Sequence, residues 1–210
     1  MSPIIRLKIS NAYSKLVLGI GLCVNNKRTQ LHMFNNCSFA LNGGRYTWRH
    51  DSILFTICHY LKLLENMGFE LFADLDGFRN PAEFFNGPRP DILLKIGNEL
   101  TAIELSCCYE NNFTKAHEYK IKRYENLKDS LVNKEHVLSK LFVEISSLGF
   151  FPRRIKDFRN FCRQFARINV TRLMLKMSEV AIRSSYFIYC RRNSIEWENP
   201  DILKFYWYIF

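Results

Sequence analysis

Two acidic residues, Asp91 and Glu104, have the types and the spacing to hold a metal ion. Arg89-Pro90-Asp91 enters a predicted strand, and Glu104 follows thirteen residues later on the predicted partner strand of the same hairpin. In a tight hairpin of this length, both carboxylates fall near the same end of the sheet, where their like charges repel. A hard divalent cation such as Mg2+ or Mn2+ relieves that repulsion through oxygen ligands, so the pair predicts a magnesium site.

A cation at this place can activate water and stabilise the charge that develops on a phosphodiester. A nearby lysine would position that water or neutralise the developing charge. In the commonest form of this acidic motif the lysine follows the second acid by two residues, but Ser106 stands there. The next predicted helix offers Lys120 and Lys122, and Lys120 shares the helix face of Ala116 because four residues separate them. We therefore predict Lys120 as the catalytic lysine, with Glu110 as a third carboxylate.

The hydrophobic pattern indicates which elements must position these residues. Apolar residues repeat at helical spacing after Asp51, and the Gly97-Asn98 pair is typical of a hairpin turn. The predicted elements are a helix from Trp48 or Asp51 to Gly68, strands over 69–73, 92–96 and 101–107, a helix over 114–132 and a strand over 137–145. The candidate inward residues of the second helix are Ala116, Tyr119, Tyr124 and Leu127. This order predicts an α/β fold with a mixed central sheet flanked by helices.

The last third of the chain is predicted to be helical, with a second long helix over 170–189. The apolar face of its first helix consists of Ile155, Phe158, Phe161, Phe165 and Ile168. Another face carries the basic residues Lys156, Arg159, Arg163 and Arg167. They form either a stripe that tracks phosphates or an ordinary solvated face, and both interpretations stay open. We divide the chain into a basic N-terminal segment over 1–47, a nuclease-like core over 48–150 and a basic helical C-terminal extension over 151–210.

The net charge of +10 is unevenly distributed. Residues 1–50 carry seven basic and no acidic residues (+7), residues 51–152 carry eleven and fifteen (−4), and residues 153–210 carry twelve and five (+7). A weakly acidic centre suits a divalent cation and the basic flanks suit a polyphosphate, so we expect DNA as the partner, with RNA as the alternative.

The odd number of cysteines, with no signal peptide and no apolar run long enough to span a membrane, favours a reducing compartment inside the cell. We expect a nuclear location and no membrane partner. The sequence does not indicate the oligomeric state.

Several of these residues together resemble the restriction-like endonuclease (PD-(D/E)xK) domain of early-branching, site-specific non-LTR retrotransposons. That family's pattern is an (R/K)PD step, an acidic strand of the form (D/E)-(V/L)-T, a nearby E, and a helix reading A-x3-K-x2-K-Y. The matching positions are Arg89-Pro90-Asp91, Glu104-Leu105-Ser106, Glu110, Ala116, Lys120 and Arg123-Tyr124. The resemblance implies a restriction-endonuclease-like fold and a magnesium-dependent DNA endonuclease whose lysine lies on the helix.

The resemblance extends to both flanks and covers residues 23–200. The stretch Arg45–Asp51 is similar to the RH-containing stretch that precedes the nuclease in that family. Upstream, three residues have the spacing of the last three ligands of a CCHC zinc knuckle, namely Cys23, His32 and Cys37. Gly19 and Ile20 stand where the first cysteine is expected, so a zinc ion would lack its fourth ligand, and both a bound zinc and a metal-free remnant stay open. The 210 residues contain no reverse transcriptase, so the resemblance implies cleavage alone.

Two other classes of function stay open. A nucleic-acid-binding module that no longer cleaves would use the basic candidates Arg89, Lys122, Lys156, Arg159, Arg163 and Arg167. A protein-interaction domain would use the aromatic tail over 205–210, for which packing on its own core is the alternative. No serine or cysteine has a recognisable nucleophile context, so His32, His50 and His59 are interpreted as structural rather than as catalytic acids or bases. Cys107 and Cys108 are predicted to be core thiols.

Overall fold

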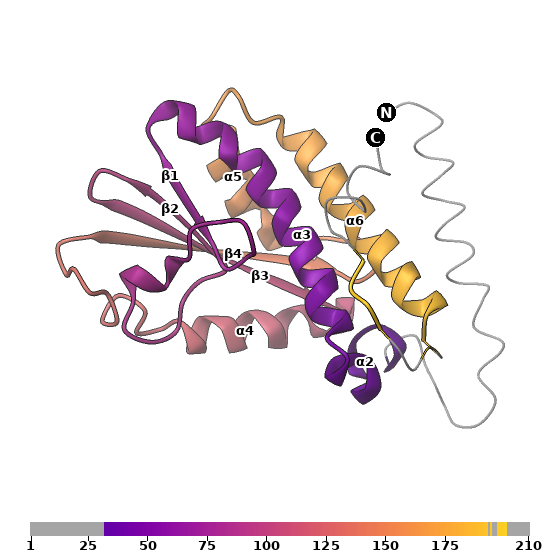
Figure 1. Cartoon of the computed structure of the whole chain (residues 1–210). Coiled ribbons are helices and arrows are strands. Elements are labelled where there is room, and N and C mark those ends of the chain that lie inside the picture. Colours follow the sequence, from indigo (N-terminus) through magenta and orange to yellow (C-terminus); the bar gives the residue numbers. More distant parts are fainter. Residues whose placement is uncertain (1–31, 193, 195–196, 201–210) are drawn as a thin grey trace.

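A four-stranded mixed sheet forms the central layer, with the strand order β1-β2-β3-β4 (Figure 1). The strands are β1 (Glu70–Ala73), β2 (Ile92–Ile96), β3 (Glu99–Cys108) and β4 (Val137–Ser146). The first three pair antiparallel in turn, and β4 pairs parallel with β3. The computed structural model describes residues 32–192, 194 and 197–200, so Cys23 and the aromatic tail lie outside the described residues. The predicted α/β fold with a mixed central sheet and flanking helices is confirmed.

Helices cover both faces of this sheet. The α-helices are α2 (Ser38–Asn42), α3 (Arg45–Leu61), α4 (Phe113–Arg123), α5 (Lys156–Arg163) and α6 (Val170–Cys190). The short turns are the π-helical η2 (His32–Asn36) and the 3-10 segments η3 (Lys62–Met67), η4 (Pro81–Phe84), η5 (Glu110–Asn112) and η6 (Arg153–Ile155). Figure 1 shows α4 on one face and α3, α5 and α6 on the other. Among the described residues, no helix combines the length and the apolar character needed to cross a bilayer.

The two faces bury different side chains because successive strand residues point to opposite sides. On β3, Ile103 and Leu105 join the larger apolar cluster, which lies under α3, α5 and α6. Ala102 joins the smaller cluster on the opposite face, where it packs with Tyr124 just beyond α4. Glu104 shares the face of Ala102, so an acidic residue is buried beneath α4 and is 4% exposed.

The helix α3 starts earlier than its sequence pattern predicts. Gly44, with a φ of 69°, precedes it, and the helix begins at Arg45. The Arg45 guanidinium is buried, and it donates to the carbonyls of Arg191 and Ser194 at 2.7 and 2.6 Å. These partners lie beyond α6, so the first turn of α3 is stabilised by a distant segment that local periodicity does not reveal.

The segment after α6 packs back on α3. Trp48 donates from Nε1 to the Pro200 carbonyl at 2.9 Å. Its ring contacts the rings of Phe187 and Trp197, with centroid separations of 5.5 and 5.7 Å. The Arg45 guanidinium lies 4.8 Å from the centre of the Trp197 ring, at cation–π distance. The helical C-terminal extension is therefore packed against the core through α3.

The helix α4 is shorter than predicted, since it ends at Arg123 and turns follow. Lys120 and Tyr124, four residues apart, both face the sheet, where Tyr124 is 3% exposed. Tyr119 lies one position before Lys120 and is 62% exposed. The prediction that Tyr119 points inward is therefore wrong, because the buried face of α4 follows the four-residue spacing of Lys120 and Tyr124.

Gly149 follows β4 in a left-handed backbone conformation that residues with a side chain rarely adopt. Its φ is +81°, and a Cβ there would lie 2.8 Å from the Ser178 carbonyl oxygen. We expect Gly149→Ala to lower the free energy of unfolding by about 3 kcal/mol, because left-handed strain and a backbone clash add. Gly77→Ala is the control, since Gly77 has a φ of +84° with no atom within 4 Å, and it should cost about 1 kcal/mol. Urea unfolding measures both variants, and equal losses would contradict the close approach at Gly149.

Candidate active site

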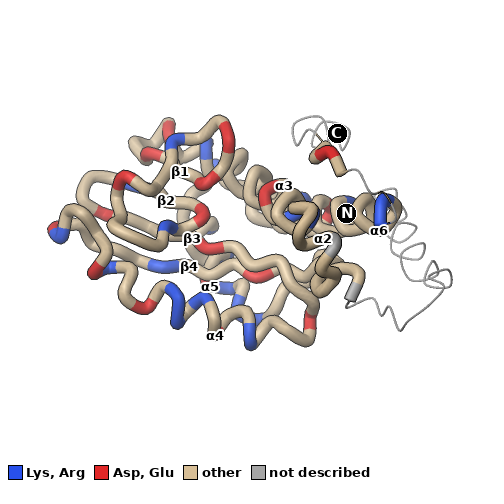
Figure 2. The backbone as a smooth tube through the Cα atoms, turned by 60° about the horizontal axis from the view of Figure 1, so that its bottom comes forward, with Lys and Arg blue, Asp and Glu red and all other residues tan. Residues whose placement is uncertain are grey.

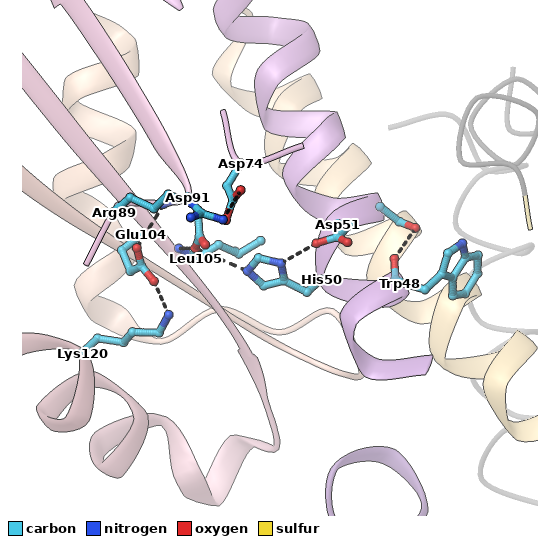
Figure 3. Close-up of polar contacts among 10 residues, drawn as sticks. Trp48, His50, Asp51, Asp74, Arg89, Asp91, Glu104, Leu105 and Lys120 are labelled. Carbon is cyan, nitrogen blue, oxygen red and sulfur yellow. Dashed lines mark hydrogen bonds and ion pairs between the residues drawn. The ribbon is translucent and has the colours of Figure 1, made fainter. Parts of the chain in front are cut away.

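Asp91 and Glu104 lie side by side at the open end of the β2–β3 hairpin (Figure 3). Because Ile92 pairs with Ile103, Asp91 at the start of β2 comes opposite Glu104. The Asp91 N–H donates to Glu104 Oε2 at 3.2 Å, and the Leu105 N–H donates to Asp91 Oδ2 at 2.7 Å. The Asp91 side chain is 17% exposed and the Glu104 side chain 5%, so the two acids lie close together where solvent has limited access.

Lys120 reaches this pair from α4. Its Nζ forms an ion pair with Glu104 Oε1. Tyr124, one turn further along, fixes the adjoining loop because its hydroxyl donates to the Arg89 carbonyl at 2.9 Å. The structure thus brings together Asp91, Glu104 and Lys120, which the sequence proposes as the site (Figure 3).

His50 of α3 also belongs to this group, although the sequence interpretation left it structural. Its Nε2 lies 3.3 Å from Asp91 Oδ2, and its Nδ1 lies 3.0 Å from Asp51 Oδ1 (Figure 3). The two carboxylates hold the ring between them, and the ring in turn fixes the Asp91 side chain. The one sequence signal for His50 was the resemblance of Arg45–Asp51 to a known stretch, because the contact depends on where α3 crosses the sheet.

Burial and neighbouring charges set the protonation of these groups. Burial raises the pKa of Glu104 to about 7, with the charge of Asp91 adding to the rise and Lys120 opposing it. Burial also raises the pKa of Asp91, but the hydrogen bond and charge of His50 outweigh it, and the pKa ends below its usual value. Burial lowers the pKa of His50, yet hydrogen bonds to Asp51 and Asp91 raise it to about 10. At neutral pH, His50 is therefore a cation, Asp91 is ionised and Glu104 is partly protonated.

The carboxylate pair fits a hard divalent cation. Asp91 Oδ1 accepts no hydrogen bond from the described residues and is not buried, so it is available as a ligand. In the part of the chain that the structure describes, no three His, Cys, Asp or Glu side chains form a metal-binding group. Mg2+ needs only one or two carboxylates, since it keeps several waters and takes further oxygens from substrate phosphates. Asp91 and Glu104 would hold such an ion, which would relieve their repulsion.

Glu110, the predicted third carboxylate, lies away from this pair. It begins η5, beyond the end of β3, and about 13 Å of extended strand separates Glu104 from Cys108. Its Oε1 is buried and has no hydrogen-bond partner within the described part of the chain. The pKa of the Cys108 thiol is raised mainly by burial, and Glu110 is among the charges that add to the rise. The structure therefore places Glu110 beside Cys108 and does not bring it to the candidate metal site.

The predicted nucleic-acid contacts are spread over several elements, and Figure 2 shows Lys and Arg positions along both α4 and α5. Arg89 lies beside the site and forms an ion pair with Asp74 at 2.9 Å. Arg159 is half-buried on α5, and its Nε has no hydrogen-bond partner among the described residues. The exposed members are Arg89, Lys122, Lys156, Arg163 and Arg167. Because α5 ends before Arg167, the helix itself carries three of the four predicted stripe residues.

The candidate zinc ligands lie mostly outside the described residues. Cys23 is not described, and of His32 only the backbone, in η2, is described. Cys37 is a half-buried free thiol, and its N–H donates to the Tyr46 hydroxyl at 3.1 Å. Zinc binding therefore stays a prediction.

Comparison with known proteins assigns no family, since no protein-family model and no curated protein matches this sequence. The function is therefore inferred from the geometry and charge of the site.

We expect His50→Ala to weaken Mn2+ binding by about 10- to 100-fold, the usual effect of removing a residue that orients a metal ligand. Without the imidazole, Asp91 loses the hydrogen bond that keeps it ionised. His59→Ala, on the same helix but exposed, is the control and should bind Mn2+ normally. Isothermal titration measures both affinities, and unchanged binding in His50→Ala would show that Asp91 needs no support from α3.

His50 also contributes to the free energy of unfolding. This contribution is fully present below pH 6.5 and is lost as the pH rises through about 10, because folding raises the pKa of His50.

Proposed function

We propose that this chain is a metal-dependent DNA endonuclease of the restriction-like type that non-LTR retrotransposons carry. The supporting observation is the convergence of two carboxylates, the half-buried Asp91 and the buried Glu104, with the amine of Lys120. Such a group binds a divalent cation and presents a positive charge next to it, which suits an anionic phosphodiester. Exposed basic residues on α4 and α5, among them Lys122, Lys156 and Arg163, suit the rest of a nucleic-acid backbone.

Each side chain has a distinct task in the proposed reaction. Asp91 and Glu104 bind Mg2+ or Mn2+, which when bound supplies the Lewis acidity that polarises the phosphate. Lys120 neutralises Glu104 before the cation is bound, and afterwards its charge is available to the phosphate oxygens. His50 keeps Asp91 ionised and oriented. Arg89, at the mouth of the site, would contact the backbone beside the cut.

The test is incubation of the purified chain with supercoiled plasmid, with Mg2+ or with EDTA. We expect nicked or linear product with Mg2+ and none with EDTA, because the acids need a cation to work on a phosphate. Product that forms equally in EDTA would contradict the proposal, and so would the absence of product with both Mg2+ and Mn2+. Nuclear location belongs to the same proposal, since DNA is the substrate.

The alternative is a chain of the same origin that binds nucleic acid without cutting. The exposed Lys156 and Arg163 on α5 favour it, since surface cations track phosphates without any chemistry. DNA binding that weakens steeply with salt, does not respond to Mg2+ and yields no product would select this alternative.

A further inference from the structure

His117, one turn before Lys120 on α4, forms a second carboxylate–base pair with Glu144 of β4. His117 Nδ1 lies 2.5 Å from Glu144 Oε1, and the His117 ring packs edge-on against Phe142. Glu144 and Phe142 lie two positions apart on β4, and Phe142 pairs in register with Glu104 of β3. His117 and Lys120 therefore stand over the same face of the sheet, about 5–6 Å apart at their Cβ atoms.

Glu144 is a buried carboxylate whose partner is the His117 imidazole. Glu144 is 1% exposed, and its Oε2 has no hydrogen-bond partner among the described residues. Burial raises the pKa of Glu144, and the hydrogen bond from His117 opposes the rise. Taking a carboxylate out of water is unfavourable, so an apolar residue would fill a purely structural position at lower cost. A buried carboxylate that holds one imidazole nitrogen is typical of an imidazole that does chemistry.

The second nitrogen of His117 reaches solvent. Because Glu144 accepts the Nδ1–H, the neutral imidazole carries its lone pair on Nε2. Nε2 has no partner among the described residues and is not buried, and the His117 side chain is 23% exposed. The lone pair is thus open to a water molecule on the helix that also carries Lys120.

We propose that His117 is the general base that activates the attacking water, with Glu144 as its positioning residue. This inference rests on the proposed function. In the step, a water O–H bond breaks and its proton moves to Nε2 of His117, while the water oxygen forms a bond to phosphorus. One backbone P–O bond breaks, and the leaving oxygen keeps the electron pair and takes a proton from solvent. Lys120 then serves charge stabilisation alone, and the two tasks are divided between neighbouring residues of α4.

The charged groups around His117 come from β4, α4 and η6. Glu144 of β4 contacts Nδ1 of the ring, and Lys120, which pairs with Glu104, lies one turn along the same helix. The charge of Arg154 of η6 opposes the rise in the pKa of Glu144. Of these groups, Glu144 alone touches the ring, so it sets the orientation of His117.

The test is His117→Gln in the full chain, assayed at saturating Mn2+. Glutamine can still donate to Glu144 but cannot take the proton, so we expect kcat to fall about 100-fold or more. The rise in Tm on adding Mn2+ should remain. His136→Gln is the matched control and should change neither, since His136 faces the Asn98 carbonyl, 3.2 Å away at the turn end of the sheet.

Each other outcome is decisive. A fully active His117→Gln, beside an inactive Asp91→Asn, overturns the role of His117 and leaves the proposed function standing. Loss of the Mn2+-dependent rise in Tm together with activity assigns His117 to the fold or to the metal site, and this also overturns its role. Equal cleavage by the wild type and Asp91→Asn overturns both proposals.

Discussion

Replacing Asp91 by asparagine is expected to lower Mg2+-dependent cleavage by about 10³-fold, because the loss of a charged ligand removes roughly 4 kcal/mol of transition-state stabilisation. Asparagine keeps the size of the side chain and can still accept the Leu105 N–H. It cannot balance the His50 cation, and it leaves Glu104 as the one carboxylate of the pair. The rate at which supercoiled plasmid is nicked measures the effect.

Asp76→Asn is the matched control for this experiment. Asp76 is exposed in the loop between β1 and β2, so its loss should leave cleavage near the wild-type rate. Circular dichroism establishes whether both variants are folded. A folded Asp91→Asn protein that nicks as fast as the wild type would remove Asp91 from the chemistry and would end the endonuclease proposal.

The second large effect is the dependence of metal binding on pH. Burial and the charge of Asp91 raise the pKa of Glu104 from 4.5 to about 7. In the metal-free protein, the stability that accompanies the protonated carboxyl is present at acidic pH and is lost as the pH rises through about 7. A cation needs the ionised form, so below pH 7 it must displace a proton. We expect Mn2+ to bind about thirty-fold more weakly at pH 5.5 than at pH 8.

Thermal unfolding with and without Mn2+ measures this dependence without any assay of cleavage. At an Mn2+ concentration about 100 times Kd, binding adds about 2.7 kcal/mol and should raise the Tm by about 5 °C at pH 8. The rise should be much smaller at pH 5.5 with the same Mn2+ concentration. Glu104→Gln, which cannot ionise, should show little rise at either pH. Equal rises in the wild type at both pH values would contradict a protonated Glu104 in the metal-free site.

The hairpin that carries the acids was predictable because its signals are local. Gly97, with a φ of 53°, provides the turn, and the predicted bounds of β2 match those in the structure. Alternation along the strands then fixes the register, which brings Asp91 opposite Glu104. Lys120 was predictable for a similar reason, since it lies one turn after Ala116 on a helix that must cover the sheet.

Contacts made between layers were not predictable in the same way. His50 reaches Asp91 because α3 is held between the sheet and α6, and no local pattern encodes that crossing. Glu110 lies close to Glu104 in sequence, yet an extended strand separates them. His117 went unnoticed because its partner Glu144 is distant in the chain and comes near only through the parallel pairing of β3 and β4.

The packing of residues 197–200 on α3 limits how far the protein can be shortened for laboratory work. A fragment that stops at Cys190 would lack the Pro200 carbonyl that accepts from the Trp48 indole. It would also lack the Arg191 and Ser194 carbonyls that accept from the Arg45 guanidinium. One restricted to 48–150 would also lose the helix that lies against α3, and with it the placement of His50. Expression boundaries are therefore best set no earlier than Pro200.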